Sequence, residues 1–197
     1  MKRGIKWSGR IGLFAEMVRA ATQRRREKLF SNFQTLKFSN YLMVTLTSGS
    51  KAPAFTGVDQ NGKKVSLKDF KGKKLVLYFY PQDGTPTCTV QACNLRDNFA
   101  QLKKAGYEIV GVSPDEVKDH KKFETKQSLP FTLIADPEHK ILEKYGVWDE
   151  KQLYGRKYMG VLRTTFLINE KGIIEQVFLK PKSKEHGEEI LRMKNKE

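Results

Sequence analysis

The 197-residue sequence has no run of 18 or more apolar residues, so it offers no segment that would cross a bilayer as a helix. It contains only two cysteines, which cannot form the disulfide framework of a small secreted domain. The histidines, His120, His139 and His186, are distant from the cysteines and from one another, which argues against a four-ligand zinc site. These absences leave one close pair, Cys88 and Cys93, and such a pair indicates redox chemistry.

The composition is that of a soluble globular protein, with 39% hydrophobic and 30% charged residues. The length allows one domain and a tail. Of the net charge of +15, residues 1–42 carry +8, from ten basic and two acidic residues, and the remaining +7 is spread along the chain. A basic excess can serve nucleic acids or anionic membranes. Because the charge of the body is spread, it favours a solvated lysine-rich surface, and we predict neither a nucleic-acid nor a membrane partner.

Residues 1–42 differ from the rest of the chain in being rich in arginine and poor in acids. Their apolar stretch, Ile11–Val18, is too short and too interrupted for a secretory signal. Two readings stay open: an organellar transit peptide, or a disordered or dispensable extension ahead of a start at Met43. We expect a domain over residues 43–197 in a cytoplasmic protein.

From Met43 onward, strand-like and helix-like segments alternate. Asn61-Gly62 predicts a hairpin turn within residues 53–70, and the apolar run Lys73–Tyr80 predicts a central strand that ends at Pro81. The remaining pattern predicts helices over 86–105, 115–127, 137–145 and 183–193, and strands over 107–113, 132–135, 164–168 and 173–179. This alternation predicts an α/β domain with a mixed central sheet flanked by helices.

The segment between the central strand and the next helix carries the strongest chemical signal. Thr85 is a good N-cap and Pro86 suits the first helical position, which places Cys88 in the first turn of the helix. Unpaired backbone N–H groups and the positive end of the helix dipole favour a thiolate there. Because the thiolate is the nucleophilic form of cysteine, this position suits attack on an O–O bond.

The spacing of the two cysteines has a geometric consequence. Five residues of regular helix separate the Cα atoms of Cys88 and Cys93 by about 8.7 Å. A disulfide needs a Cα separation below about 7 Å. A bond between these cysteines therefore requires the start of the helix to unwind.

These residues resemble those of a known family. Pro81, Thr85 and Cys88 fit the P-x-x-x-T-x-x-C signature of peroxiredoxins. The similarity continues through the sequences TPTCT, ACNLRDNF, YGVW, YGRKYMG and RTTFLI, spanning residues 85–168. The whole series resembles the atypical two-cysteine branch, called bacterioferritin-comigratory protein or peroxiredoxin Q. The resemblance covers about residues 46–195 and does not include residues 1–42.

The resemblance implies a thioredoxin-like fold and a role for each matching residue. Cys88 would be the peroxidatic cysteine, which becomes a sulfenic acid, and Cys93 the resolving cysteine, which condenses with it to a disulfide. Thr85 would hydrogen-bond the thiolate and the peroxide, and Pro81 would shield the site from water. Arg163 would hold the thiolate and the peroxide oxygens through its guanidinium donors.

The resemblance also implies the partners. The substrate would be hydrogen peroxide or an organic hydroperoxide, and the reductant would be thioredoxin or a similar dithiol, acting through a mixed disulfide. The chemistry requires no cofactor and no metal, and the branch is often monomeric. One departure is Thr87, which stands where the family often has glycine, and its β-branched side chain would stiffen the turn that must unwind.

Three rival functions predict different behaviour. A disulfide oxidoreductase of thioredoxin type requires C-x-x-C, whereas this chain has C-x4-C. A basic binding protein would show salt-sensitive binding and no peroxide consumption. A holdase chaperone activity is supported by no feature of the sequence.

Overall fold

The computed structural model describes residues 46–153 and 155–194. Residues 1–45, which include the predicted extension over residues 1–42, lie outside the described part. The predicted domain boundary at Met43 therefore stays a prediction.

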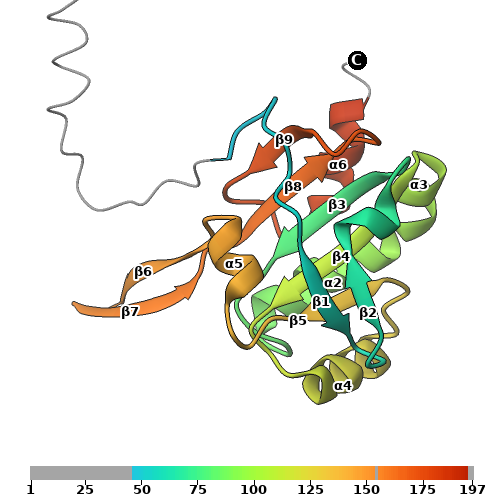
Figure 1. The fold of residues 1–197 in the computed structure, drawn as a ribbon. Coiled ribbons are helices and arrows are strands. Elements are labelled where there is room, and N and C mark those ends of the chain that lie inside the picture. Colours follow the sequence, from blue (N-terminus) through green and yellow to red (C-terminus); the bar gives the residue numbers. More distant parts are fainter. Residues whose placement is uncertain (1–45, 154, 195–197) are drawn as a thin grey trace, which may run out of the picture. The chain divides into compact units, whose positions relative to one another are not determined.

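A seven-stranded sheet forms the centre of the described part (Figure 1). Its strands are β1 (Thr56–Asp59), β2 (Lys64–Ser66), β3 (Lys74–Phe79), β4 (Tyr107–Ser113), β5 (Thr132–Ala135), β8 (Thr164–Ile168) and β9 (Ile174–Phe178). They lie in the order β2-β1-β5-β4-β3-β8-β9. β4 pairs in parallel with β3 and β5, and the other pairs are antiparallel, so the predicted mixed sheet is confirmed.

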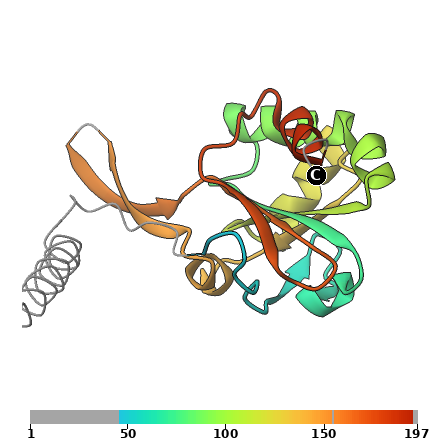
Figure 2. The same ribbon diagram turned by 90° about the horizontal axis from the view of Figure 1, so that it is seen from above.

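The helices are α2 (Pro86–Asp97), α3 (Phe99–Lys104), α4 (Val117–Gln127), α5 (Lys140–Lys144) and α6 (His186–Lys194), with a 3-10 helix η1 (Leu67–Phe70). α5 lies on one face of the sheet, and the other four α-helices lie on the opposite face (Figures 1 and 2). Each face of the sheet carries a hydrophobic core, and alternate residues of β3 pack into one core or the other. Leu75 and Leu77 face the α5 side, and Val76 and Tyr78 face the α2 side.

The predicted helices differ from the observed ones at their ends, and two of the differences have a cause in the described hydrogen bonds. The helix predicted over residues 86–105 is two helices, because Asn98 leaves helical geometry and donates from its side chain to the carbonyl of Asn94 at 3.0 Å. The helix predicted over residues 137–145 begins only at Lys140. There the Asp136 carboxylate accepts hydrogen bonds from the backbone of Ile141 and Leu142 at 2.8 Å and so replaces the missing helical partners.

A two-stranded arm was not predicted. β6 (Trp148–Leu153) and β7 (Arg156–Val161) pair antiparallel and extend away from the central sheet (Figures 1 and 2). Tyr158 and Met159 of β7 are about half exposed, at 47% and 51%. The arm lacks the apolar runs from which the other strands were predicted. Its second strand is followed by Leu162 and then by Arg163, which immediately precedes β8.

Candidate active site

The start of α2 has the geometry that the sequence predicts. Thr85 is the N-cap in an extended conformation, Pro86 is the first helical residue and Cys88 the third. The Cys88 side chain is only 2% exposed. The thiol therefore lies in the first helical turn, close to unpaired N–H groups and largely screened from water.

Arg163 reaches Cys88 from another element of the fold. It immediately precedes β8, which pairs with the central strand β3. Its Nη2 atom lies 3.0 Å from the sulfur of Cys88, across 75 residues of sequence. A guanidinium at this distance stabilises a thiolate and leaves further N–H donors for an oxygen-rich ligand.

Gln91 orients this arginine and was not identified from the sequence. Its side chain is fully buried on α2, one turn after Cys88, and its Oε1 atom accepts a 2.5 Å hydrogen bond from Nη1 of Arg163. Its Nε2 atom has no hydrogen-bond partner among the described residues. The only signal that would have revealed it is the i, i+3 spacing from Cys88, and that spacing is common on helices.

The structure places the two other predicted site residues, Thr85 and Pro81, next to the loop that precedes Cys88. The Thr85 hydroxyl donates to the carbonyl oxygen of Gln82 at 3.1 Å, so it does not point its proton at Cys88. Pro81 directly follows the buried Tyr80 at the end of the central strand and is itself half-buried. Both residues border the loop before α2.

Cys93 lies on the same helix, toward α4. Both cysteines are free thiols, and Cys93 is half-buried. Its sulfur is 3.5 Å from Oε1 of Gln127, the last residue of α4. Arg96 donates from Nη1 to the backbone carbonyl of Gln127 at 2.7 Å. The half of α2 that carries Cys93 is thus tied to α4.

The arm adds a further cation near the site. Lys151, on β6, is half-buried, and its pKa is lowered mainly by burial and also by the positive charge of Arg163, while Cys88 acts in the opposite direction. The charge of Lys151 therefore responds to both site residues. Because the arm was not predicted, Lys151 was not a candidate from sequence.

A buried polar network lies beside the loop before α2. Asp83, Asp115 and His120 bring three possible ligand atoms within 4.8 Å of one another. These atoms already hydrogen-bond within the network, since Asp83 pairs with His120 and Asp115 accepts from Ser113. Burial raises the pKa of Asp115, although its hydrogen bonds oppose the shift. Asp83 lies 32 residues before Asp115 in the sequence, so no local pattern indicates that these residues form a cluster.

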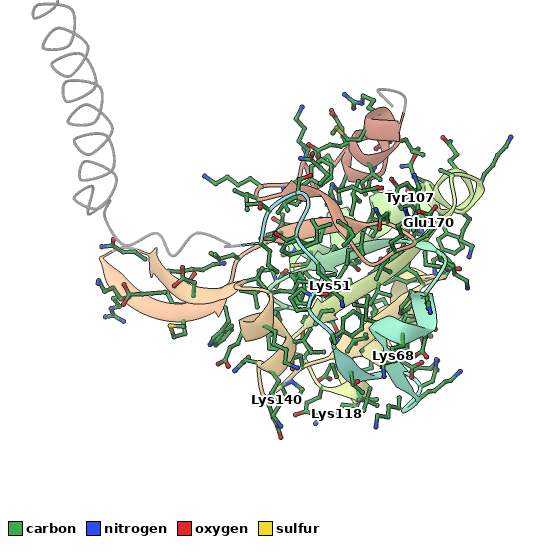
Figure 3. The ribbon with its side chains drawn as sticks, turned by 45° about the horizontal axis from the view of Figure 1, so that its top comes forward. Lys51, Lys68, Tyr107, Lys118, Lys140 and Glu170 are labelled. Atoms are coloured by element: carbon green, nitrogen blue, oxygen red, sulfur yellow. The ribbon has the colours of Figure 1, made fainter. Side chains whose placement is uncertain are left out.

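The sequence predicts neither a nucleic-acid partner nor a membrane partner, and the exposed lysines and the helices bear on these two predictions. The exposed lysines that Figure 3 labels, Lys51, Lys68, Lys118 and Lys140, come from separate segments of the described chain. Among the described residues, none of the helices is both long and apolar enough to span a membrane.

Comparisons with known proteins agree with this geometry. Residues 48–177 match the model of the AhpC/TSA family. The chain is 45% identical to the peroxiredoxin Bcp of Escherichia coli strain K12 over 149 aligned residues. The alignment covers 76% of this chain and 96% of that protein.

Solved structures show the same fold. Peroxiredoxin Q of Xanthomonas campestris superposes with a TM-score of 0.68 at 33% identity, over 72% of this chain and 90% of that one. A second structure, of the bacterioferritin comigratory protein of the same organism, has a TM-score of 0.68 at 32% identity with the same coverage, and its description concerns alkyl peroxide reduction. The α/β fold with a mixed, thioredoxin-like sheet is thereby confirmed.

Proposed function

The chain belongs to the AhpC/TSA family and is a peroxiredoxin, a thiol peroxidase, and on this premise we propose that Cys88 is the residue that attacks the hydroperoxide. The observation that carries the proposal is the 3.0 Å contact between Arg163 and the buried Cys88 sulfur in the first turn of α2. A cation and a helix N-terminus both favour the nucleophilic thiolate.

In the first step the Cys88 thiolate attacks the terminal oxygen of the peroxide. The S–O bond forms as the O–O bond breaks, and the released alkoxide, or hydroxide from hydrogen peroxide, takes a proton to become an alcohol or water. Sulfur is oxidised by two electrons to the sulfenic acid and the peroxide is reduced by two. Arg163 holds the oxygens as charge develops on the leaving one, and Gln91 keeps the guanidinium in place.

Thr85 and Pro81 shape the same space. For the Thr85 hydroxyl to donate to a bound peroxide, it must turn away from the Gln82 carbonyl that it now contacts. This rotation exchanges one hydrogen bond for another, and the new bond strengthens as negative charge develops on the leaving oxygen of the peroxide. Pro81 limits the access of water to the sulfur by its apolar ring.

In the second step Cys93 resolves the sulfenic acid. Its thiolate attacks the sulfur of Cys88, the disulfide forms, and the hydroxyl group leaves and is protonated to water. Both cysteines lie on α2, where regular spacing holds their Cα atoms about 8.7 Å apart, beyond the reach of a disulfide. The first turn of α2 must therefore unwind.

Oxidation itself supports this unwinding. The described side-chain hydrogen bonds that tie the first half of α2 to the rest of the fold run from Cys88 and Gln91 to Arg163. Conversion of the thiolate to a neutral sulfenic acid removes the negative charge that Arg163 faces. The contact thus weakens at the stage when Cys88 must move toward Cys93.

The disulfide must then be reduced by a dithiol, and we propose thioredoxin as the donor, acting through a mixed disulfide. The substrates are hydrogen peroxide and organic hydroperoxides, in keeping with the alkyl peroxide reduction described for the Xanthomonas campestris relative. The cycle needs no cysteine from a second subunit, because both cysteines lie on one helix, and we propose that the protein acts as a monomer. The cytoplasmic location stays a prediction.

Peroxide-dependent oxidation of NADPH, measured in a mixture of the protein, thioredoxin and thioredoxin reductase, tests the assignment. We expect turnover in the wild type, none in Cys88→Ser, and in Cys93→Ser the consumption of one equivalent of peroxide without thioredoxin-linked turnover. Substantial turnover in Cys88→Ser would remove Cys88 from the mechanism. Turnover with dithiothreitol but not with thioredoxin would contradict the proposed reductant alone.

A further inference from the structure

The loop before α2 is fastened at Asp83. One oxygen of the Asp83 carboxylate accepts a 2.7 Å hydrogen bond from the Tyr80 hydroxyl, and the other lies 2.7 Å from Nδ1 of His120. The backbone N–H of Asp83 donates to the Asp115 carboxylate at 2.8 Å. Side chain and backbone of this one residue are thus both held.

The groups that hold Asp83 belong to rigid parts of the fold. Tyr80 directly follows β3 and is 1% exposed, and His120 is fully buried in the first turns of α4. Asp115 is itself fixed by Ser113, the last residue of β4, whose hydroxyl donates to it at 2.6 Å. Burial raises the pKa of Tyr80 well above its ordinary value, so its hydroxyl stays a donor.

The next residue, Gly84, is not held in this way. Gly84 has a positive φ of 71°, and nothing lies within 4 Å of the position where a Cβ would be. Pro86 and Thr87 are exposed. From Gly84 to Cys88 the chain is held by the bonds of the helix, by the Thr85 contact to Gln82 and by Arg163. Gly84 is therefore placed as a hinge next to a fixed residue.

We propose that Asp83 and His120 are positioning residues that set the balance between the wound first turn of α2, which reacts with peroxide, and the unwound turn, which forms the disulfide. The inference rests on the proposed function, in which Cys88 leaves the helix to meet Cys93. With Asp83 fixed, the wound turn presents Cys88 to Arg163. With Asp83 released, the loop gains freedom and the unwound turn gains population.

Two pairs of variants test the role of the network. Asp83→Ala removes the carboxylate, whereas Asp83→Asn keeps a group that bonds Tyr80 and His120. His120→Leu and His120→Asn form the same contrast from α4. Asp119→Asn, which removes an exposed carboxylate of α4 that pairs with Lys122, is the control for lost charge.

The rates are measured by rapid quench after mixing with hydrogen peroxide, with mass spectrometry of the sulfenic acid, trapped by dimedone, and of the disulfide. In Asp83→Ala and His120→Leu we expect the peroxide rate constant to fall about tenfold and the disulfide rate constant to rise severalfold, as a population shift requires. The Asn variants should restore both rates to within about threefold. A fall of both rates together, or no change in either, would overturn the proposal.

Hydrogen exchange of the reduced protein in a Cys93→Ser background gives a test independent of disulfide formation. The Thr89 amide, which donates to the Thr85 carbonyl at 2.9 Å, reports the winding of the first turn. Asp83→Ala should speed exchange at residues 89–91 and leave residues 94–97 unchanged. Unchanged exchange at residues 89–91 would overturn the inference, whereas failure of the wild type to form a disulfide would contradict only the role of Cys93.

Discussion

The two halves of α2 are held in different ways. In the first half, residues 86–91, the described side-chain hydrogen bonds to the rest of the fold run from Cys88 and Gln91 to one residue, Arg163. The second half, residues 92–97, contacts both α4 and α6 through Cys93, Asn94 and Arg96. On the proposed mechanism, oxidation of Cys88 weakens one of the hydrogen bonds of the first half, whereas the hydrogen bonds of the second half do not involve Cys88. That division allows one cysteine to move while the other stays in place.

The largest effect is expected at the contact that serves both reactivity and attachment. Arg163→Met should lower the second-order rate constant with hydrogen peroxide by about 100-fold or more, because it removes the guanidinium that faces the thiolate and the developing oxyanion. Stopped-flow measurement of peroxide consumption gives the rate. Arg156→Met, which changes an exposed arginine of β7, should leave it unchanged. Equal losses in the two variants would show that net charge, not this contact, matters.

A smaller effect is expected at Gln91, which touches the arginine rather than the sulfur. Gln91→Met keeps the volume but removes the acceptor for Nη1 of Arg163, and the peroxide rate constant should fall about tenfold through loss of orientation. The same stopped-flow assay applies, with Gln101→Met on the exposed surface of α3 as the control. A wild-type rate in Gln91→Met would mean that Arg163 is positioned by its backbone alone.

In the second half of α2, we expect a substitution to lower the stability of the fold and to leave the peroxide rate constant unchanged. The Asn94 side chain accepts from the Gly187 backbone at 2.7 Å and donates to the Lys184 carbonyl and the Glu188 carboxylate at 3.0 Å. Asn94→Ala should lower the free energy of unfolding by about 1–3 kcal/mol, measured in urea, with the peroxide rate constant unchanged. Val90→Ala, an exposed change in the first half, should cost less than about 0.5 kcal/mol. The reverse order of the two costs would break the comparison.

The smallest effect is a pH dependence in α6. His186 is fully buried, bonds Thr165 at 2.9 Å and has a lowered pKa, mainly because burial disfavours its charged form, although Glu189 opposes the shift. The unfolded chain therefore binds more protons, so stability falls as pH drops through the ordinary value of 6.5. Between pH 7.5 and 5.5, His186→Gln should lose less stability than the wild type, by up to about 1 kcal/mol. Identical slopes in urea titrations would contradict this.

The parts of the fold that were predictable are those in which local pattern and burial agree. β4, β5 and β8 have the predicted bounds because strands inside the sheet are largely buried and appear in the sequence as short, mostly apolar segments. The hairpin at Asn61-Gly62 is confirmed, and Asp59 supports it by accepting from the backbone of Asn61 and Lys63.

The rest depends on contacts that no local pattern records. α2 and α3 separate at Asn98, against which Gly187 of α6 packs so closely that a Cβ would meet it at 2.6 Å. Strand β7 of the arm is exposed along most of its length, so no apolar run marks it. In the site, the helix start that carries Cys88 followed from Thr85 and Pro86, whereas Arg163 followed only from the resemblance. Gln91 and the Asp83 network required the structure.

The division of α2 is tested most directly by hydrogen exchange of the fully reduced and the peroxide-oxidised protein, read by mass spectrometry of short peptides. The account predicts one intramolecular disulfide between Cys88 and Cys93, with much faster exchange at residues 89–91 of the oxidised form. Residues 94–97 and α6 should retain the protection of the reduced form, since their contacts do not involve the thiolate. Equal loss of protection along all of α2, or formation of the disulfide with protection at residues 89–91 unchanged, would contradict the account.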